Sequence, residues 1–152
     1  PRMRPLLWQV SAFTLAHTIT LALASLGYVA ISPRIVEPLI AASIVLIAVE
    51  NLVTDGLSRW RPLVVFGFGL LHGLGFASML IDIGLPDGGF WPALIGFNLG
   101  VEFGQLTVIA VAFGLTAYWF GNRPWYRRTI AMPASVLIAA VGVWWFVERV
   151  FL

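Results

Sequence analysis

Five long apolar segments constrain the fold of this chain more than any other feature. They cover about residues 6–30, 36–55, 62–82, 90–120 and 126–151, and Pro, Gly or charged residues separate them. A helix needs roughly 20 mainly apolar residues to cross the hydrocarbon core of a bilayer. All five segments are long enough, and the fourth is long enough to be tilted or to extend beyond the membrane. The sequence therefore predicts an all-α fold, a polytopic membrane bundle of five transmembrane helices.

The composition agrees with a membrane environment. Hydrophobic residues make up 60% of the chain and charged residues 11%, whereas a soluble domain is about 45–50% apolar and about 25% charged. No connection between the segments is long enough for a soluble domain, so we expect residues 1–152 to form a single transmembrane helical domain. The chain begins without an initiator Met or a signal-peptide pattern. We therefore expect it to be the membrane part of a longer precursor.

The arginines predict an orientation. All nine basic residues are Arg, and seven of them flank the segments at one end: Arg2, Arg4, Arg59, Arg61, Arg123, Arg127 and Arg128. The other end carries two arginines and four carboxylates: Arg34, Arg149, Glu37, Asp82, Asp87 and Glu148. Because cytoplasmic loops are enriched in basic residues, the first residue is predicted to be cytoplasmic and the last extracytoplasmic. No basic cluster exceeds a few residues, so nucleic acid is not an expected partner.

Four ionisable side chains lie about five or more residues from the ends of their apolar segments, one in each of the first four: His17, Glu50, His72 and Glu102. A charged residue at the centre of a membrane helix costs roughly 2.5–3.5 kcal/mol on insertion scales, so these groups should avoid lipid. We predict that they converge in a shared pocket. Imidazole and carboxylate groups are ligands of divalent transition metals, and the chain has no cysteine to supply thiolates. The four residues are therefore predicted to bind a divalent transition metal: nickel, cobalt, zinc, iron or manganese.

Polar residues near these four are predicted to orient them through hydrogen bonds: Thr14, Thr20, Asn51, Asn98 and Gln105. Asn98, Glu102 and Gln105 have the i, i+4, i+7 spacing that places side chains on one face of a helix. Simpler explanations stay open for the ionisable residues. Either histidine can be a hydrogen-bonded packing residue, Glu102 can pair with a histidine, and Glu50 can pair with Arg59 or Arg61.

Glycines form two further patterns. Gly96, Gly100 and Gly104 repeat every four residues, a stripe that is predicted to let a neighbouring helix approach closely. Four more glycines surround His72: Gly67, Gly69, Gly73 and Gly75. These favour either close helix packing or a local unwinding that exposes carbonyl groups to an ion.

Four segments carry a family resemblance. They are Phe-Thr-Leu-Ala-His-Thr-Ile-Thr-Leu at 13–21, Glu-Pro-Leu-Ile-Ala-Ala-Ser-Ile at 37–44 leading to Glu50-Asn51, Gly-Leu-Leu-His-Gly-Leu-Gly-Phe-Ala at 69–77, and Phe-Asn-Leu-Gly-Val-Glu-Phe-Gly-Gln at 97–105. In this order they resemble the second subfamily of the HupE/UreJ membrane proteins. The resemblance implies a nickel or cobalt permease, or an accessory membrane protein of hydrogenase or urease maturation, in a bacterial inner membrane.

Three functions are compatible with these observations. The first is a divalent-metal transporter or metal-binding membrane protein that uses the His and Glu residues. The second is an intramembrane metalloenzyme, but the chain has no His-Glu-x-x-His pair, which favours a non-enzymatic role. The third is an accessory subunit whose polar core only holds the bundle together. Five helices are few for a complete transport path, so a homo-oligomer is a further expectation.

Overall fold

The structure, a computed structural model, describes residues 3–56, 58–84 and 88–152. Within these residues the elements are all helical: α1 (Met3–Ser25), α2 (Pro33–Val53), α3 (Arg61–Asp82), α4 (Phe90–Ala112), η1 (Phe113–Ala117), α5 (Tyr118–Phe120), η2 (Arg127–Ala131) and α6 (Met132–Phe151). Five spans, 4–25, 33–53, 61–82, 90–120 and 127–151, are long and apolar enough to cross a membrane. The predicted five-helix, all-α architecture is confirmed. Arg2 and Asp87 lie outside the described residues.

Two helix ends differ from the predicted bounds, and a glycine and a proline at these positions explain the differences. Gly27 adopts a positive φ of 81°, and the following N–H of Tyr28 bonds to the carbonyl of Leu23 at 2.9 Å. This glycine-dependent cap ends α1 at Ser25, before the predicted residue 30. Pro33 begins α2 ahead of the predicted residue 36, because its fixed φ suits the first turn of a helix.

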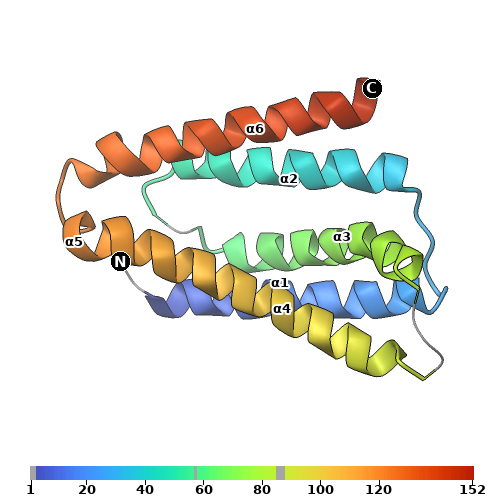
Figure 1. Ribbon diagram of the computed structural model, residues 1–152. Coiled ribbons are helices and arrows are strands. Elements are labelled where there is room, and N and C mark those ends of the chain that lie inside the picture. The colour runs from blue at the N-terminus through green and yellow to red at the C-terminus, as the bar shows by residue number, and fades with distance from the viewer. Residues whose placement is uncertain (1–2, 57, 85–87) are drawn as a thin grey trace.

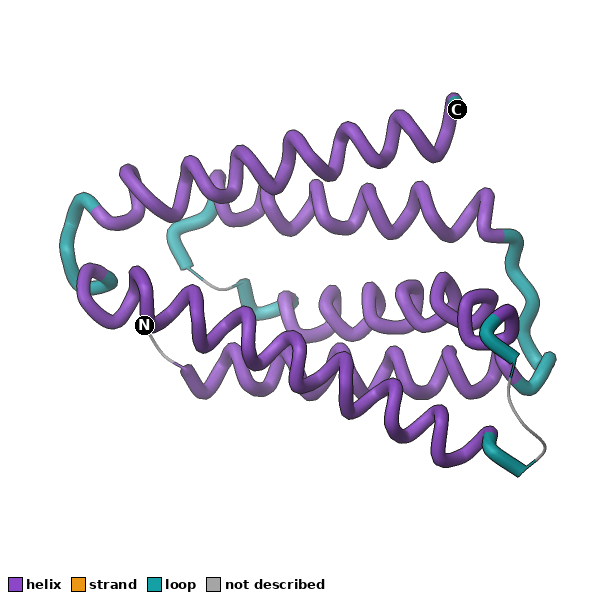
Figure 2. The backbone as a smooth tube through the Cα atoms, viewed as in Figure 1, coloured by secondary structure: helices purple, strands orange, loops and turns teal. Residues whose placement is uncertain are grey.

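The helices lie in two pairs. Helix α1 packs along α3, and α2 packs along α6, while contacts between α2 and α3 join the pairs and α4 crosses α1 (Figure 1). The connecting loops gather at two opposite ends of the bundle (Figure 2). One is the arginine-rich end, with Arg4, Arg59, Arg61, Arg123, Arg127 and Arg128. The other is the acidic end, with Glu37, Asp82 and Glu148.

Burial is distributed as expected in lipid. Large apolar side chains cover the outside, among them Leu15 at 59% exposed and Phe103 at 67%. Polar residues share the interior with small and apolar ones: His17 is only 1% exposed and Asn98 6%, beside buried Ala16 and Leu21. Because an exterior of this kind is stable only in an apolar solvent, the chain is an integral membrane protein.

Two glycines of α3, Gly69 and Gly73, bring α1 into close contact. A Cβ placed on Gly69 would lie 2.6 Å from the carbonyl oxygen of Phe13, and one on Gly73 would lie 2.5 Å from that of His17. Since α3 continues unbroken through these glycines, close packing rather than unwinding is their role. The predicted packing of the stripe Gly96, Gly100 and Gly104 is wrong within this chain. A Cβ on any of the three would meet no described neighbour within 4 Å.

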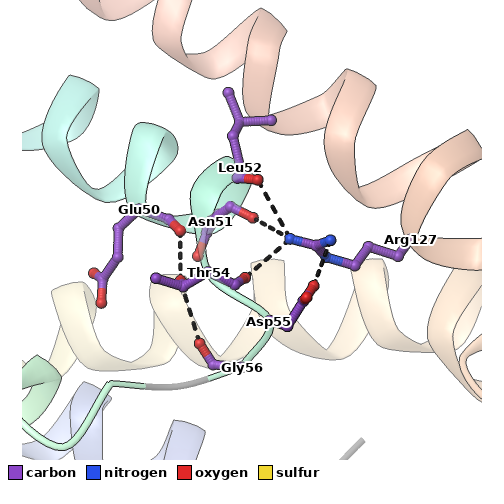
Figure 3. A network of polar contacts seen from close by, with 7 residues as sticks. All are labelled: Glu50, Asn51, Leu52, Thr54, Asp55, Gly56 and Arg127. Carbon is purple, nitrogen blue, oxygen red and sulfur yellow. Dashed lines mark hydrogen bonds and ion pairs between the residues drawn. The ribbon is translucent and has the colours of Figure 1, made fainter.

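Arg127 connects the beginning of the last span to the end of α2 through hydrogen bonds and an ion pair (Figure 3). Its Nη2 donates to the carbonyl oxygens of Thr54 at 2.9 Å and Leu52 at 3.3 Å, and its Nη1 lies 2.5 Å from the Asp55 carboxylate. These carbonyls belong to the C-terminal end of α2, where backbone acceptors lack helical partners and the helix dipole attracts a cation.

Replacing Arg127 with Ala should lower the free energy of unfolding by about 1–2 kcal/mol, because the α2 carbonyls lose a charged donor. Asp55→Asn should cost less than about 1 kcal/mol, since the Asp55 side chain is 86% exposed and its ion pair is screened by water. Unfolding of detergent-solubilised protein measures both effects, with the neighbouring, exposed Arg128→Ala as a control. Equal losses for the Arg127 and Arg128 variants contradict this role.

Candidate functional site

His17 is the most deeply enclosed polar side chain of the bundle. It is 1% exposed, and its Nδ1 lies 2.9 Å from Oδ1 of Asn98 on α4. Its ring stacks with Phe13 and Phe97, at centroid distances of 6.0 and 5.9 Å, and tilts against Phe76 at 5.7 Å. The imidazole is thus held by one hydrogen bond and three aromatic rings from three helices.

The hydrogen bonds determine which nitrogen of His17 carries the proton. Nδ2 of Asn98 donates to the carbonyl of Leu94 at 2.8 Å, so the amide turns its Oδ1 toward the imidazole. An amide oxygen can only accept, and Nδ1 of His17 is therefore the N–H donor. In the neutral ring the lone pair then lies on Nε2. That atom is buried and has no partner among the described residues.

His72 on α3 has the same arrangement through a different acceptor. Its Nδ1 lies 2.7 Å from the carbonyl oxygen of Phe68, which can only accept, so Nδ1 again carries the proton. The lone pair is left on Nε2, which forms no hydrogen bond with any described residue. The Phe13 ring packs edge-on against His72 at 5.1 Å and stacks with His17. One aromatic ring thus contacts both imidazoles.

A cavity of about 750 Å³ lies between α2, α3 and α6 and has His72 in its wall. Towards the acidic end it is lined by Glu37, Asp82 and Arg149. Phe76 lines it as well and contacts the His17 ring at 5.7 Å, so this side chain stands between the cavity and His17. The cavity therefore connects the acidic end of the bundle to one of the two imidazoles.

The four predicted ligands do not gather in one cluster. Within the described ranges, no three His, Asp or Glu side chains are placed to hold one metal ion, so the predicted shared pocket of His17, Glu50, His72 and Glu102 is not formed. Glu102 lies on the face of α4 between Asn98 and Gln105. Glu50 lies near the arginine-rich end of α2, where its carbonyl accepts from Thr54 Oγ1 at 2.5 Å. Glu50 is separated from His72 by depth. It lies three residues, about 5 Å, from the arginine-rich end of α2, whereas His72 lies eleven residues, about 16 Å, from the same end of α3.

The other predicted polar residues divide between two regions. Thr14 Oγ1 donates to Gln105 Oε1 at 3.5 Å, beside the His17–Asn98 pair, and Thr20 Oγ1 donates to the Leu70 carbonyl at 2.6 Å. Asn51 is elsewhere, at the arginine-rich end, where its Oδ1 accepts from Arg61 Nη1 at 2.7 Å. Arg61 thus donates a hydrogen bond to Asn51. Among the described residues, Glu50 forms no ion pair with Arg59 or Arg61, so that alternative is not observed.

The aromatic rings around His17 and the cavity beside His72 were not predicted from the sequence. Phe13 and Phe76 each stand four residues from a histidine, a spacing that places them on the same helix face. This spacing is present in the sequence, but many residues that only pack against a helix face have the same spacing, so it does not identify a site. The ion pair between Glu37 and Arg149, whose Oε2 and Nη1 lie 2.9 Å apart, joins residues far apart in the sequence and had no local signal.

The fold, the buried imidazole of His17 and the half-buried imidazole of His72 define a class: polytopic α-helical membrane proteins with a histidine-containing polar site inside the bundle. A family model described as "HupE / UreJ protein" matches residues 1–149. The chain belongs to the HupE/UreJ family, as its four sequence motifs predicted. No curated protein and no solved structure matches the chain significantly.

Proposed function

We propose that this chain binds a divalent transition-metal ion within the membrane and transports it, with His17 and His72 as ligands. The observation that carries the proposal is the buried, unpartnered Nε2 of His17. A buried acceptor without a partner costs about 1–3 kcal/mol, a cost that a bound cation removes. Metal-binding histidines usually donate their second ring nitrogen to a protein oxygen, and both imidazoles do so here.

The axial spacing of the polar groups favours transport over permanent storage. Asp82 and Glu37 lie at the acidic end, the two histidines near the middle, and Glu50 near the arginine-rich end. Glu102 is one turn beyond Asn98 in the direction of that end, a step of about 6 Å. We propose that Glu102 and Glu50 receive the ion or its displaced protons after the histidines. A pathway needs sites that bind strongly enough for entry and weakly enough for release.

The family supports nickel or cobalt as the ion, and imidazole nitrogen also suits zinc. We further propose that the arginine-rich end is cytoplasmic, in line with the positive-inside rule. The expected homo-oligomer stays a prediction.

The proposal is tested by titrating the purified chain with Ni²⁺, Co²⁺ and Zn²⁺ and by following metal uptake into proteoliposomes. We expect saturable binding of at least one of these ions and uptake above that of empty liposomes. Binding should weaken as the pH falls, because protons compete with the metal for the imidazoles. Thr107→Ala, which removes an exposed hydroxyl that bonds only to its own helix, should leave both readouts unchanged. A wild-type chain that binds none of the three ions contradicts the proposal.

Asn98 should act on the metal through His17. Asn98→Leu removes the acceptor for Nδ1–H and should weaken metal binding about 10–100-fold, the usual effect of losing a hydrogen-bond partner of a ligand. Asn98→Asp keeps an acceptor at the same distance and should retain most of the affinity. Calorimetric titration of the two variants measures the difference. If Asn98→Leu binds as well as Asn98→Asp, the imidazole does not depend on this hydrogen bond.

A further inference from the structure

We infer that the cavity between α2, α3 and α6 is the aqueous entrance through which a hydrated divalent cation reaches His72 from the acidic end. The inference rests on the proposed function and specifies the route to its site. The occupant of the cavity is then an ion with its water molecules. The alternative, which the experiment below tests, is that a lipid chain fills the cavity.

The size and depth of the cavity suit this occupant. Its volume of about 750 Å³ exceeds by far the roughly 30 Å³ that one water molecule occupies, so an ion fits together with its hydration shell. Asp82 and His72, both in its wall, are ten residues apart on α3, about 15 Å along the helix axis. That distance is half of the roughly 30 Å hydrocarbon core. The cavity therefore brings the acidic end within reach of a ligand at mid-membrane depth.

The charges at the mouth favour a cation. Two carboxylates, Glu37 and Asp82, face one guanidinium, Arg149, which leaves a net negative charge. The Glu37–Arg149 pair is partly solvated, with the two side chains 41% and 53% exposed, so it is weak and can be displaced. An arriving cation competes with Arg149 for Glu37, and Arg149 occupies that carboxylate when no ion is present. The pair thus keeps at the mouth a carboxylate that an arriving cation can take over from Arg149.

The inner end of the cavity leads towards the second imidazole. Phe76 lines the cavity and also contacts the rings of His17 and Phe97. Phe76 therefore lies between the cavity, which has His72 in its wall, and the His17 ring. We therefore infer that the ion reaches His72 first and His17 second.

The absence of native cysteine allows a direct test of this entrance. Ile44 lines the cavity, whereas Leu46, two residues further along α2, is 56% exposed on the lipid side and is not part of the lining. Ile44→Cys and Leu46→Cys are labelled in membranes with a cationic, membrane-impermeant methanethiosulfonate. We expect Ile44→Cys to react at least about tenfold faster than Leu46→Cys, and Ni²⁺ to slow its reaction severalfold. Ser78→Cys, a nearly isosteric change in the cavity wall, repeats the test if Ile44→Cys fails to fold.

The charge at the mouth has its own readout. Adding Glu37→Gln to Ile44→Cys should slow the cationic reagent about threefold or more but leave the rate of a neutral methanethiosulfonate unchanged. If Ile44→Cys and Ser78→Cys are as unreactive as Leu46→Cys, lipid fills the cavity and the inference is wrong. It is also wrong if both react without protection by Ni²⁺ while the wild-type chain binds Ni²⁺ in a parallel titration, a result that leaves the proposed function standing. Absence of metal binding by the wild-type chain instead contradicts the proposed function, and the inference with it.

Discussion

His17→Phe is expected to weaken divalent-metal binding by more than about a hundredfold, beyond the 10–100-fold effect of losing a ligand's hydrogen-bond partner. The phenyl ring fills the space that the imidazole occupies between Phe13 and Phe97. It supplies no lone pair where Nε2 now lies buried. Metal titration and proteoliposome uptake should both fall to background.

The choice of phenylalanine separates binding from folding. His17→Ala should also lose metal binding, but it leaves a cavity at a fully buried position and should lower the free energy of unfolding by about 2–5 kcal/mol, as large-to-small core changes do. In His17→Phe the packing is retained, and only the Asn98 Oδ1 loses its donor. Thermal unfolding in detergent compares the two variants. If His17→Phe is folded and still binds metal with wild-type affinity, the ligand role of His17 is refuted.

Gly73→Ala and Gly69→Ala are expected to destabilise the bundle by about 1–3 kcal/mol each through overpacking between α1 and α3. A Cβ at Gly73 meets Thr20 and the His17 carbonyl, and one at Gly69 meets the carbonyl and Cα of Phe13. These are mostly backbone atoms, which cannot turn aside as a flexible side chain can. The helices must therefore separate, and the His17 ring moves with α1.

Gly67→Ala is the matched control on the same helix. A Cβ there has no described neighbour within 4 Å, and the change brings the same gain in helix propensity, so stability should be unchanged or higher. Unfolding of the three variants in detergent gives the comparison. Equal stabilities for Gly67→Ala and Gly73→Ala would show that α1 and α3 do not depend on their close approach.

The positions of the helices could be predicted because the bilayer admits few alternatives. Each apolar segment long enough to cross it must satisfy its backbone hydrogen bonds internally, and a helix does so. The remaining errors were at ends such as that of α1, where a cap at Gly27 counts for more than the apolar character of the residues that follow. The sequence also identified His17 and Asn98 as polar residues to be shielded from lipid, because an exposed polar group there is costly.

The sequence by itself thus determined the five spans and which polar residues must turn inward, since both follow from the cost of polar groups in lipid. Only the tertiary structure decided which of those residues meet. His17 pairs with Asn98, 81 positions away, because α4 crosses α1, while no three histidines and carboxylates of the described residues come together. Likewise, the cavity beside His72 exists because α2, α3 and α6 meet around it. Contacts between distant segments depend on how helices pack, and hydropathy does not encode that packing.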